Sequence, residues 1–185
     1  MTFREETLQR ARPTSVRSVQ LPRRQSFHPS PADWQDEVIY FLLPDRFSDG
    51  REAQRPQLDR ANLGAARPSG FRFDRWADAG GSRWQGGTIR GIASKLGYLT
   101  DLGITTLWIG PVFKQRVHLD TFHGYAIQDF LDVDPRFGTR QDLVDLVQAA
   151  HEQHLRVILD VVFNHSGSNW VYADGNAREK PFVGF

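Results

Sequence analysis

Residues 88–109 read TIRGIASKLGYLTDLGITTLWI, and this stretch decides the fold. Its first part predicts a helix that begins at Thr88 and ends at Gly103, because apolar residues recur there every three or four positions. These apolar residues are Ile89, Ile92, Leu96 and Leu99. Directly after Gly103, residues 104–109 form a short apolar run that is typical of a buried strand. The predicted helix and strand are therefore joined by only Leu102 and Gly103.

The same pattern extends on both sides of this stretch. Residues 38–43 and 157–163 are two further apolar runs, and both predict buried strands. A second helix is predicted to begin at Thr139, because Asp142 follows three residues later in a capping-box pattern. Its buried stripe is expected to contain Leu143, Leu146, Val147 and Ala150. The order strand, helix, strand, helix, strand predicts parallel strands in right-handed βαβ units.

Loop lengths indicate where function lies. The connections from helix to strand are very short, whereas those from strand to helix run over residues 44–87 and 110–138. Long loops in a compact domain are usually functional. The long loops follow the carboxyl ends of the predicted strands. Both (β/α) barrels and doubly wound sheets place their sites at that end, so topology alone does not choose between the two folds. The doubly wound alternative usually has a Gly-rich phosphate turn after its first strand. Here residues 44–47 read PDRF, which cannot form such a turn around a phosphate.

Composition excludes several kinds of protein. The chain has 185 residues, a formal net charge of +1 and no cysteine, which excludes disulfides, thiol catalysis and Cys-based zinc sites. The balanced charge gives no reason to expect a nucleic-acid partner. No apolar run approaches the roughly 18 residues of a membrane span, so no membrane partner is expected. Residues 1–25 are Arg-rich and lack the apolar core of a secretory signal, so we expect a cytoplasmic location.

Two clusters of polar and aromatic residues could carry chemistry. Residues 160–165, DVVFNH, place Asp160, Asn164 and His165 at the end of the third predicted strand. A buried Asp needs a partner, which we expect to be an Arg from a neighbouring strand. The simpler alternative is an Asp that caps the next loop beside a surface His. The other cluster is His123-Gly124-Tyr125, which is either an ordinary polar loop or an aromatic platform for a sugar.

Taken together, these segments resemble the alpha-amylase family of glycoside hydrolases. The resemblance rests on several motifs in the family's order, and it covers residues 36–168. The motifs are residues 38–50, 84–88, 96–99, 102–109, 123–139 and 160–165. It implies an α/β fold that is the N-terminal part of a (β/α)8 TIM barrel, with about three βα units, truncated before closure. Residues 1–35 would then be a disordered or extended leader, and residues 169–185 would begin the loop or subdomain after strand three.

The resemblance also implies a role for each candidate residue. His165 is similar to the family's imidazole that hydrogen-bonds the sugar at the cleavage subsite, and Tyr125 to the aromatic platform under that sugar. His123 is expected beside them as a substrate-binding residue. Asn164 is similar to a side-chain ligand of a structural Ca²⁺, for which an amide oxygen is suitable. Asp160 is similar to an acid that orients an Arg beside the nucleophile. The implied substrates are α-glucans or maltooligosaccharides, cleaved with retention.

Some features of the chain depart from the family pattern. Ala126 stands where relatives that trim single glucose units often have Asp, which favours endo-acting or transferase relatives. A further calcium site of some relatives is not expected, because residues 49–51 read DGR and residues 80–84 read GGSRW.

The resemblance places the catalytic carboxylates on strands four, five and seven of the barrel. We therefore expect no catalytic residue in this chain, and we expect the chain alone to be inactive and prone to aggregate. The open alternatives are a transglycosylase or isomerase of the same family, and a non-catalytic glucan-binding fragment.

Overall fold

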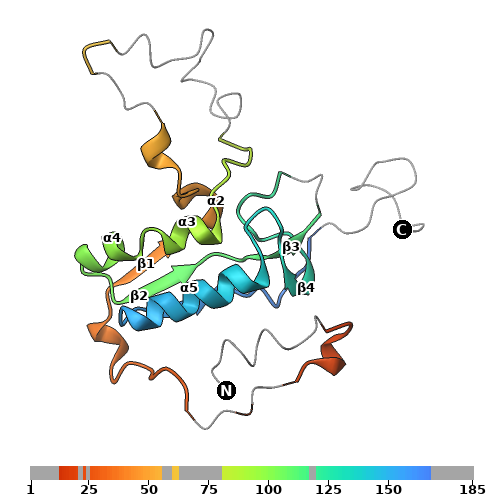
Figure 1. Ribbon diagram of the computed structural model, residues 1–185. Coiled ribbons are helices and arrows are strands. Elements are labelled where there is room, and N and C mark those ends of the chain that lie inside the picture. Colours follow the sequence, from red (N-terminus) through yellow and green to blue (C-terminus); the bar gives the residue numbers. More distant parts are fainter. Residues whose placement is uncertain are drawn as a thin grey trace, which may run out of the picture.

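The computed structural model describes residues 13–20, 23, 26–55, 60–62, 81–116 and 120–167. In this part of the chain, three parallel strands form one sheet in the order β1-β2-β5 (Figure 1). They are β1 (Ile39–Leu42), β2 (Thr106–Ile109) and β5 (Arg156–Leu159). The expected parallel βαβ arrangement is therefore confirmed, and each strand lies in its predicted place but contains fewer residues than predicted.

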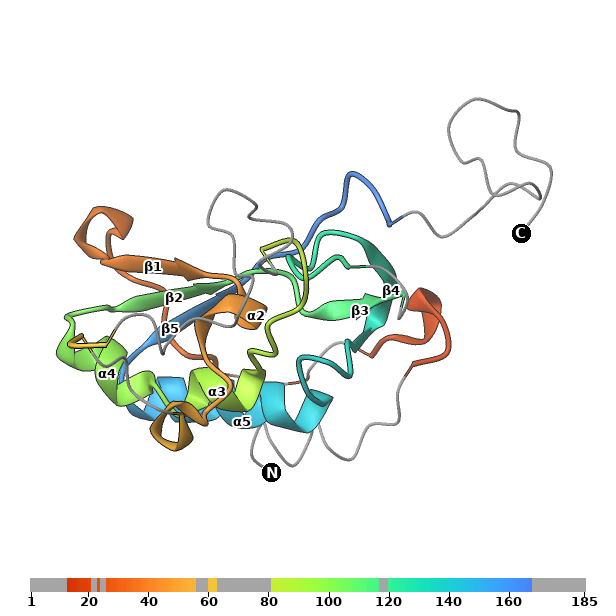
Figure 2. The same cartoon turned by 90° about the horizontal axis from the view of Figure 1, so that it is seen from above.

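Three helices cover one face of this sheet. They are α3 (Ile89–Ala93), α4 (Leu96–Asp101) and α5 (Arg140–Glu152). Figure 2 shows all three on the same side of the strands. The short helix α2 (Pro44–Phe47) follows β1 directly, and 3-10 turns lie at Val16–Ser18, Trp34–Asp36 and Glu52–Gln54.

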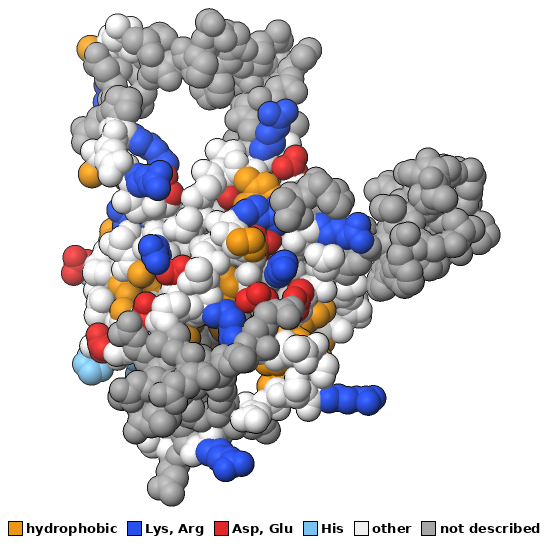
Figure 3. Space-filling view, turned by 45° about the vertical axis from the view of Figure 1, so that its right-hand side comes forward, with side chains coloured by type: hydrophobic (Ala, Val, Ile, Leu, Met, Phe, Trp, Pro, Cys, Tyr) orange, Lys and Arg blue, Asp and Glu red, His pale blue; other side chains and the backbone are white. Residues whose placement is uncertain are grey.

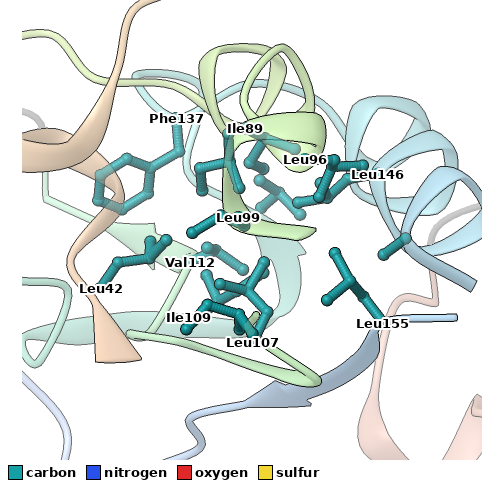
Figure 4. Packing of buried hydrophobic residues seen from close by; sticks show 14 residues of the cluster. Leu42, Ile89, Leu96, Leu99, Leu107, Ile109, Val112, Phe137, Leu146 and Leu155 are labelled. Carbon is teal, nitrogen blue, oxygen red and sulfur yellow. The ribbon is translucent and has the colours of Figure 1, made fainter. Parts of the chain in front are cut away.

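The core lies between the sheet and the helices. Leu42, Leu107 and Ile109 point from the strands toward α3, α4 and α5, as the close-up in Figure 4 shows. All four apolar residues predicted for the first helix are at most 1% exposed. In the second helix Leu146 and Ala150 are fully buried, and Leu143 packs against the core. The spacing therefore predicted the buried face of the first helix correctly. In the second helix Val147 is only half-buried, and Val144, which was not predicted, is 7% exposed.

The predicted first helix is divided into two. α3 ends at Ala93, and α4 begins at Leu96 after a turn at Ser94 and Lys95. The Ser94 hydroxyl donates a 2.7 Å hydrogen bond to the carbonyl of Gly91, and such a bond from a serine to the preceding turn bends a helix. Gly103 does follow the second helix, at φ +86°.

The third strand is shorter than predicted because its partner ends. Among the described residues β5 pairs only with β2, and the last hydrogen bond between them runs from Asp160 N to Ile109 O at 2.9 Å. β2 is followed by Gly110 and Pro111, which carry the chain away from the sheet. Residues 161–163, predicted to continue the strand, therefore have no strand beside them in the described part of the chain and form a loop.

An antiparallel hairpin was missed by sequence reasoning. β3 (Phe113–Gln115) pairs with β4 (Ile127–Val133) within the long loop between β2 and α5. The pairing is irregular, with register shifts on both sides of Lys114. The capping box of α5 was predicted correctly, because Thr139 and Asp142 exchange side-chain-to-backbone hydrogen bonds.

The opposite face of the sheet is not covered by any helix among the described residues. Its exposed aromatic side chains are Phe41 and Trp108, which are 46% and 40% exposed and whose rings meet edge to face with centroids 5.2 Å apart. An apolar sheet face of this kind is normally buried against other parts of a fold. Elsewhere on the surface, Figure 3 shows basic and acidic side chains interspersed over the face that it presents.

The described part of the leader contacts the domain. His28 stacks on His151 of α5 with ring centroids 3.9 Å apart, and Pro29 O accepts a hydrogen bond from Arg156. Arg156 also forms an ion pair with Glu37 at 2.7 Å. The predictions for residues 1–12 and 169–185 lie outside the described residues.

Candidate functional site

The two predicted clusters meet at the carboxyl end of the sheet. Tyr125 lies in the segment that leads into β4, and Asp160 follows β5 directly. The Tyr125 hydroxyl donates a 2.9 Å hydrogen bond to Oδ2 of Asp160. Burial and this carboxylate both raise the pKa of Tyr125, so the phenol stays protonated as the donor. The partner of Asp160 in the described residues is therefore a tyrosine, where sequence reasoning had expected an arginine.

His123 supports the backbone of Tyr125. The Tyr125 N–H donates to Nδ1 of His123 at 3.0 Å, and the two rings stack with centroids 5.6 Å apart. A nitrogen that accepts this bond carries no proton, so a neutral His123 holds its proton on Nε2. Burial lowers the pKa of His123, which favours this neutral form.

His165 approaches the same residue from the loop after β5. Its Nε2 lies 3.2 Å from the carbonyl oxygen of Tyr125, and its side chain is exposed. Because a carbonyl oxygen only accepts, Nε2 of His165 carries the proton in this contact. The structure therefore brings together four of the predicted residues, namely His123, Tyr125, Asp160 and His165.

Asn164, the fifth predicted residue, directly precedes His165 and is exposed. Within the described ranges, no three His, Asp or Glu side chains lie together in a metal-binding arrangement. The described residues therefore provide one amide oxygen for a calcium ion but not a set of ligands, which usually contains six to eight oxygens.

The position of Tyr125 depends on a buried network that sequence reasoning missed. Asp134 is fully buried and accepts hydrogen bonds from Gln115 N at 2.9 Å and from Arg136 Nη2 at 2.8 Å. Burial alone would raise the pKa of Asp134, but the bonds from Arg136 and Gln115 lower it overall. The side chain of Gln115 in turn accepts a hydrogen bond from Ala126 N at 3.2 Å. The sequence signal that could have indicated this network is Asp134 itself, a charged residue directly after the apolar strand residue Val133.

A second buried carboxylate holds the loop after β1. Asp45 is 2% exposed and accepts 2.9 Å hydrogen bonds from the backbone N–H groups of Gln85 and Gly86. The neighbouring Arg46 contacts the residue before His123, because its guanidinium lies 3.7 Å from the centre of the Phe122 ring. The first loop is thus connected to the segment that carries His123 and Tyr125.

The residues after β1 do not fit the further calcium site considered above. The Asp49 carboxylate is bound by the Arg55 guanidinium and by the Arg51 N–H. The Asp49 carboxylate is therefore already paired with an internal cation, and the guanidinium groups of Arg51 and Arg55 cannot be ligands of Ca²⁺.

No helix in the described part of the chain is both long and apolar enough to cross a membrane. The surface in Figure 3 likewise shows no large area of a single charge on the side that it presents.

Comparisons with known proteins identify the family of the chain. Residues 41–183 match the family model described as alpha amylase, catalytic domain. The chain is 38% identical over 151 residues to the beta/alpha-amylase of Paenibacillus polymyxa, covering 81% of this chain and 11% of that protein. It is 32% identical over 166 residues to the periplasmic alpha-amylase of Escherichia coli, covering 83% of this chain and 22% of that protein.

Solved structures give the same result. The alpha-amylase of Geobacillus thermoleovorans, determined in complex with acarbose, matches with a TM-score of 0.54 and 36% identity over 74% of this chain and 25% of that one. The chain thus spans a quarter or less of the length of each of these relatives. The expected fold, the N-terminal part of a (β/α)8 barrel, is confirmed by these neighbours and by the open parallel sheet. The chain belongs to the alpha-amylase family of glycoside hydrolases, and its matched residues lie in that family's catalytic domain.

Proposed function

We propose that this chain provides part of the sugar-binding floor of an enzyme that acts on α-glucosidic bonds of starch-like glucans or maltooligosaccharides. The observation that carries the proposal is the convergence of Tyr125 and His165 at the carboxyl end of the sheet. The ring of Tyr125 would stack on the apolar face of a glucose unit. Its hydroxyl and backbone are already engaged by Asp160, His123 and His165, so the ring is held in place before a sugar arrives.

The neighbouring residues would complete this subsite. In the part of the chain that the structure describes, only Nε2 of His165 has a hydrogen-bond partner, which leaves Nδ1 to accept a bond from a sugar hydroxyl. His123 would line the subsite beside Tyr125. Asp160 would hold the Tyr125 ring in place through its hydrogen bond with the phenol hydroxyl. In the complete barrel it would also orient an arginine. Asn164 would contribute one oxygen to a structural calcium ion whose other ligands lie outside the described residues.

A direct binding experiment tests the platform. We expect the 185-residue chain to bind maltoheptaose in isothermal titration calorimetry. Tyr125→Ala should weaken binding about tenfold, or about 1.4 kcal/mol, because the apolar contact with the ring is lost. Tyr125→Phe, which keeps the ring, should bind much more tightly than Tyr125→Ala. Tyr98→Ala removes an exposed tyrosine on α4 and should change nothing. Equal affinities of wild type and Tyr125→Ala would contradict the proposal.

We further propose that the 185-residue chain binds without hydrolysing. Its sheet contains three strands in the described residues, and the family resemblance assigns the nucleophile and the acid/base to later strands. A reducing-sugar assay on starch with the purified chain tests this point. Release of reducing ends above a buffer blank would overturn it.

For a complete catalytic domain, we propose cleavage with retention. The test is a chimera in which residues 36–167 replace the matching segment of the periplasmic alpha-amylase of Escherichia coli. The expected first product carries the α configuration at its new reducing end, as seen by NMR, whereas a β product would contradict the proposal. Transfer of glucosyl units to a second maltooligosaccharide in the same assay would favour the transglycosylase alternative. The cytoplasmic location remains a prediction, to be tested by cell fractionation.

A further inference from the structure

Two loops run side by side at the candidate site and are connected at three points. The Tyr125 hydroxyl bonds to Asp160, and the Tyr125 carbonyl lies 3.2 Å from Nε2 of His165. The third connection is a short backbone hydrogen bond of 2.7 Å from Gly167 N to Ile127 O. The first two contacts use side chains that can rotate. The third fixes the distance between the two main chains.

There is no room for a side chain at Gly167. A Cβ atom built there would lie 2.4 Å from the carbonyl oxygen of Ala126 and 2.7 Å from its carbonyl carbon. A Cβ atom cannot lie this close to either atom, and both neighbouring atoms belong to the backbone, so no side chain can move aside. The backbone of Gly167 is not in the left-handed region, so space and not conformation requires a glycine there.

A second close approach lies on the other side of Tyr125. Gly124 has φ +87°, and a Cβ atom there would lie 2.0 Å from the carbonyl oxygen of Pro111. The backbone around Tyr125 is therefore packed between the end of β2 on one side and the loop after β5 on the other. A displacement on either side has to move the tyrosine.

We propose that Gly167 is a positioning residue for the sugar platform, because its close contact with Ala126 sets the spacing between the ring of Tyr125 and the imidazole of His165. This inference rests on the proposed function, in which one glucose unit contacts both groups. Any larger residue at 167 has to move the loop after β5 away from Ala126. The Tyr125–Asp160 and Tyr125–His165 contacts would lengthen together, although neither side chain had been changed.

The test compares Gly167→Ala with two matched variants. Ser166→Ala alters the adjacent exposed position, whose hydroxyl contacts only the carbonyl of Gly167 among the described residues. Gly97→Ala adds the same methyl group in α4, where a Cβ atom meets nothing within 4 Å. Both controls should behave as wild type.

The first measurement needs no sugar. The ionisation of Tyr125 is followed by phenolate absorbance, and its signal is identified by subtracting the titration of Tyr125→Phe. In Gly167→Ala, separation from Asp160 and exposure to water should move the pKa of Tyr125 down toward its ordinary value. An unchanged pKa of Tyr125 in a folded Gly167→Ala would overturn the inference.

The second measurement is affinity for maltoheptaose, which should fall about tenfold in Gly167→Ala and stay unchanged in both controls. Tight binding by Gly167→Ala overturns the inference while the proposed function stands. If the wild type itself does not bind maltoheptaose, the proposed function fails, and the Tyr125 titration alone decides the inference.

A third measurement covers the case in which Gly167→Ala does not fold. Hydrogen exchange is measured on the wild-type chain, where the Gly167 amide should exchange far more slowly than that of the exposed Ser166. Equal exchange rates would mean that the two loops do not stay in contact, and this would also overturn the inference.

Discussion

The hydroxyl of Tyr125 and the carboxylate of Asp160, 35 positions apart in the chain, are joined by a 2.9 Å hydrogen bond. The bond connects the hairpin segment after β2 with the loop after β5. It therefore holds two segments that are distant in the sequence against each other at the carboxyl end of the sheet.

Removing the charge of Asp160 should change Tyr125. In Asp160→Asn, the pKa of Tyr125 should fall relative to wild type, because a nearby carboxylate disfavours the phenolate, while burial still keeps the pKa above its ordinary value. Absorbance titration measures the change. Asp36→Asn, at an exposed position of the turn at Trp34–Asp36, serves as the control. A Tyr125 titration that is the same in Asp160→Asn and wild type would show that the bond is absent in solution.

Asp45 should be important for stability. Asp45→Ala leaves the N–H groups of Gln85 and Gly86 without their buried acceptor, and we expect unfolding to become easier by about 3 kcal/mol. Urea denaturation gives the value from the shift of the midpoint at constant slope. Asp101→Ala, at the exposed end of α4, should cost far less. Equal midpoints for the two variants would exclude this role.

Glu52 should make stability depend on acid pH. Hydrogen bonds from Ser48 and from its own backbone, together with Lys95, lower the pKa of Glu52 from 4.5 to about 2. A carboxylate whose folded pKa is depressed stabilises the fold above its unfolded pKa, and this contribution is lost as the pH falls toward the folded value. Glu52→Gln should therefore flatten the loss of stability between pH 4.5 and about 2.

The measurement for Glu52 is a series of urea unfolding curves across this pH range. Glu152→Gln, at the exposed end of α5, is the matched control and should keep the wild-type slope. A wild-type slope in Glu52→Gln would show that the contact with Ser48 and Lys95 does not form.

The cap of α5 should contribute a measurable amount to stability. Thr139 accepts a 3.1 Å hydrogen bond from Asp142 N, and Thr139→Ala leaves that N–H group unpaired at the helix start. The expected cost is about 1 kcal/mol. Thr100→Ala, which removes a hydroxyl on the exposed surface of α4, is the comparison. Thermal unfolding of both variants decides the point, and an equal loss in the two would argue against a specific capping effect.

The uncovered sheet face should cause self-association of the 185-residue chain. Phe41 and Trp108 are exposed side by side on that face, and apolar surfaces of this kind bind one another. Phe41→Lys combined with Trp108→Lys should reduce oligomers in sedimentation experiments. Tyr98→Lys, on the helical side, should leave them unchanged. A wild-type chain that is monomeric at all concentrations tested would contradict this prediction.

Local pattern was enough to predict the order of the three parallel strands and of the helical segments between them, and the buried face of α3 and α4. The spacing of Ile89, Ile92, Leu96 and Leu99 determines one apolar stripe whatever the helix packs against, because helical geometry repeats every 3.6 residues. The capping box at Thr139 and Asp142 was visible for the same reason, since both partners lie within one turn.

What local pattern did not predict are contacts between distant segments. The hairpin of β3 and β4, the hydrogen bonds that Asp45 accepts from residues 85 and 86, and the Asp134 network all join distant positions. Each group in these contacts is satisfied by a partner that only the folded chain brings near.

Residue patterns alone indicated strands and helices in alternation, an ordered set of alpha-amylase family motifs, and aromatic and imidazole groups at the carboxyl ends of the strands. The pairing of Asp160 with Tyr125 and the close approach of Gly167 to Ala126 became visible only in the folded chain. The physical reason is that propensity and periodicity act over a few residues, whereas hydrogen-bond partners and close backbone approaches depend on how separate loops pack in three dimensions.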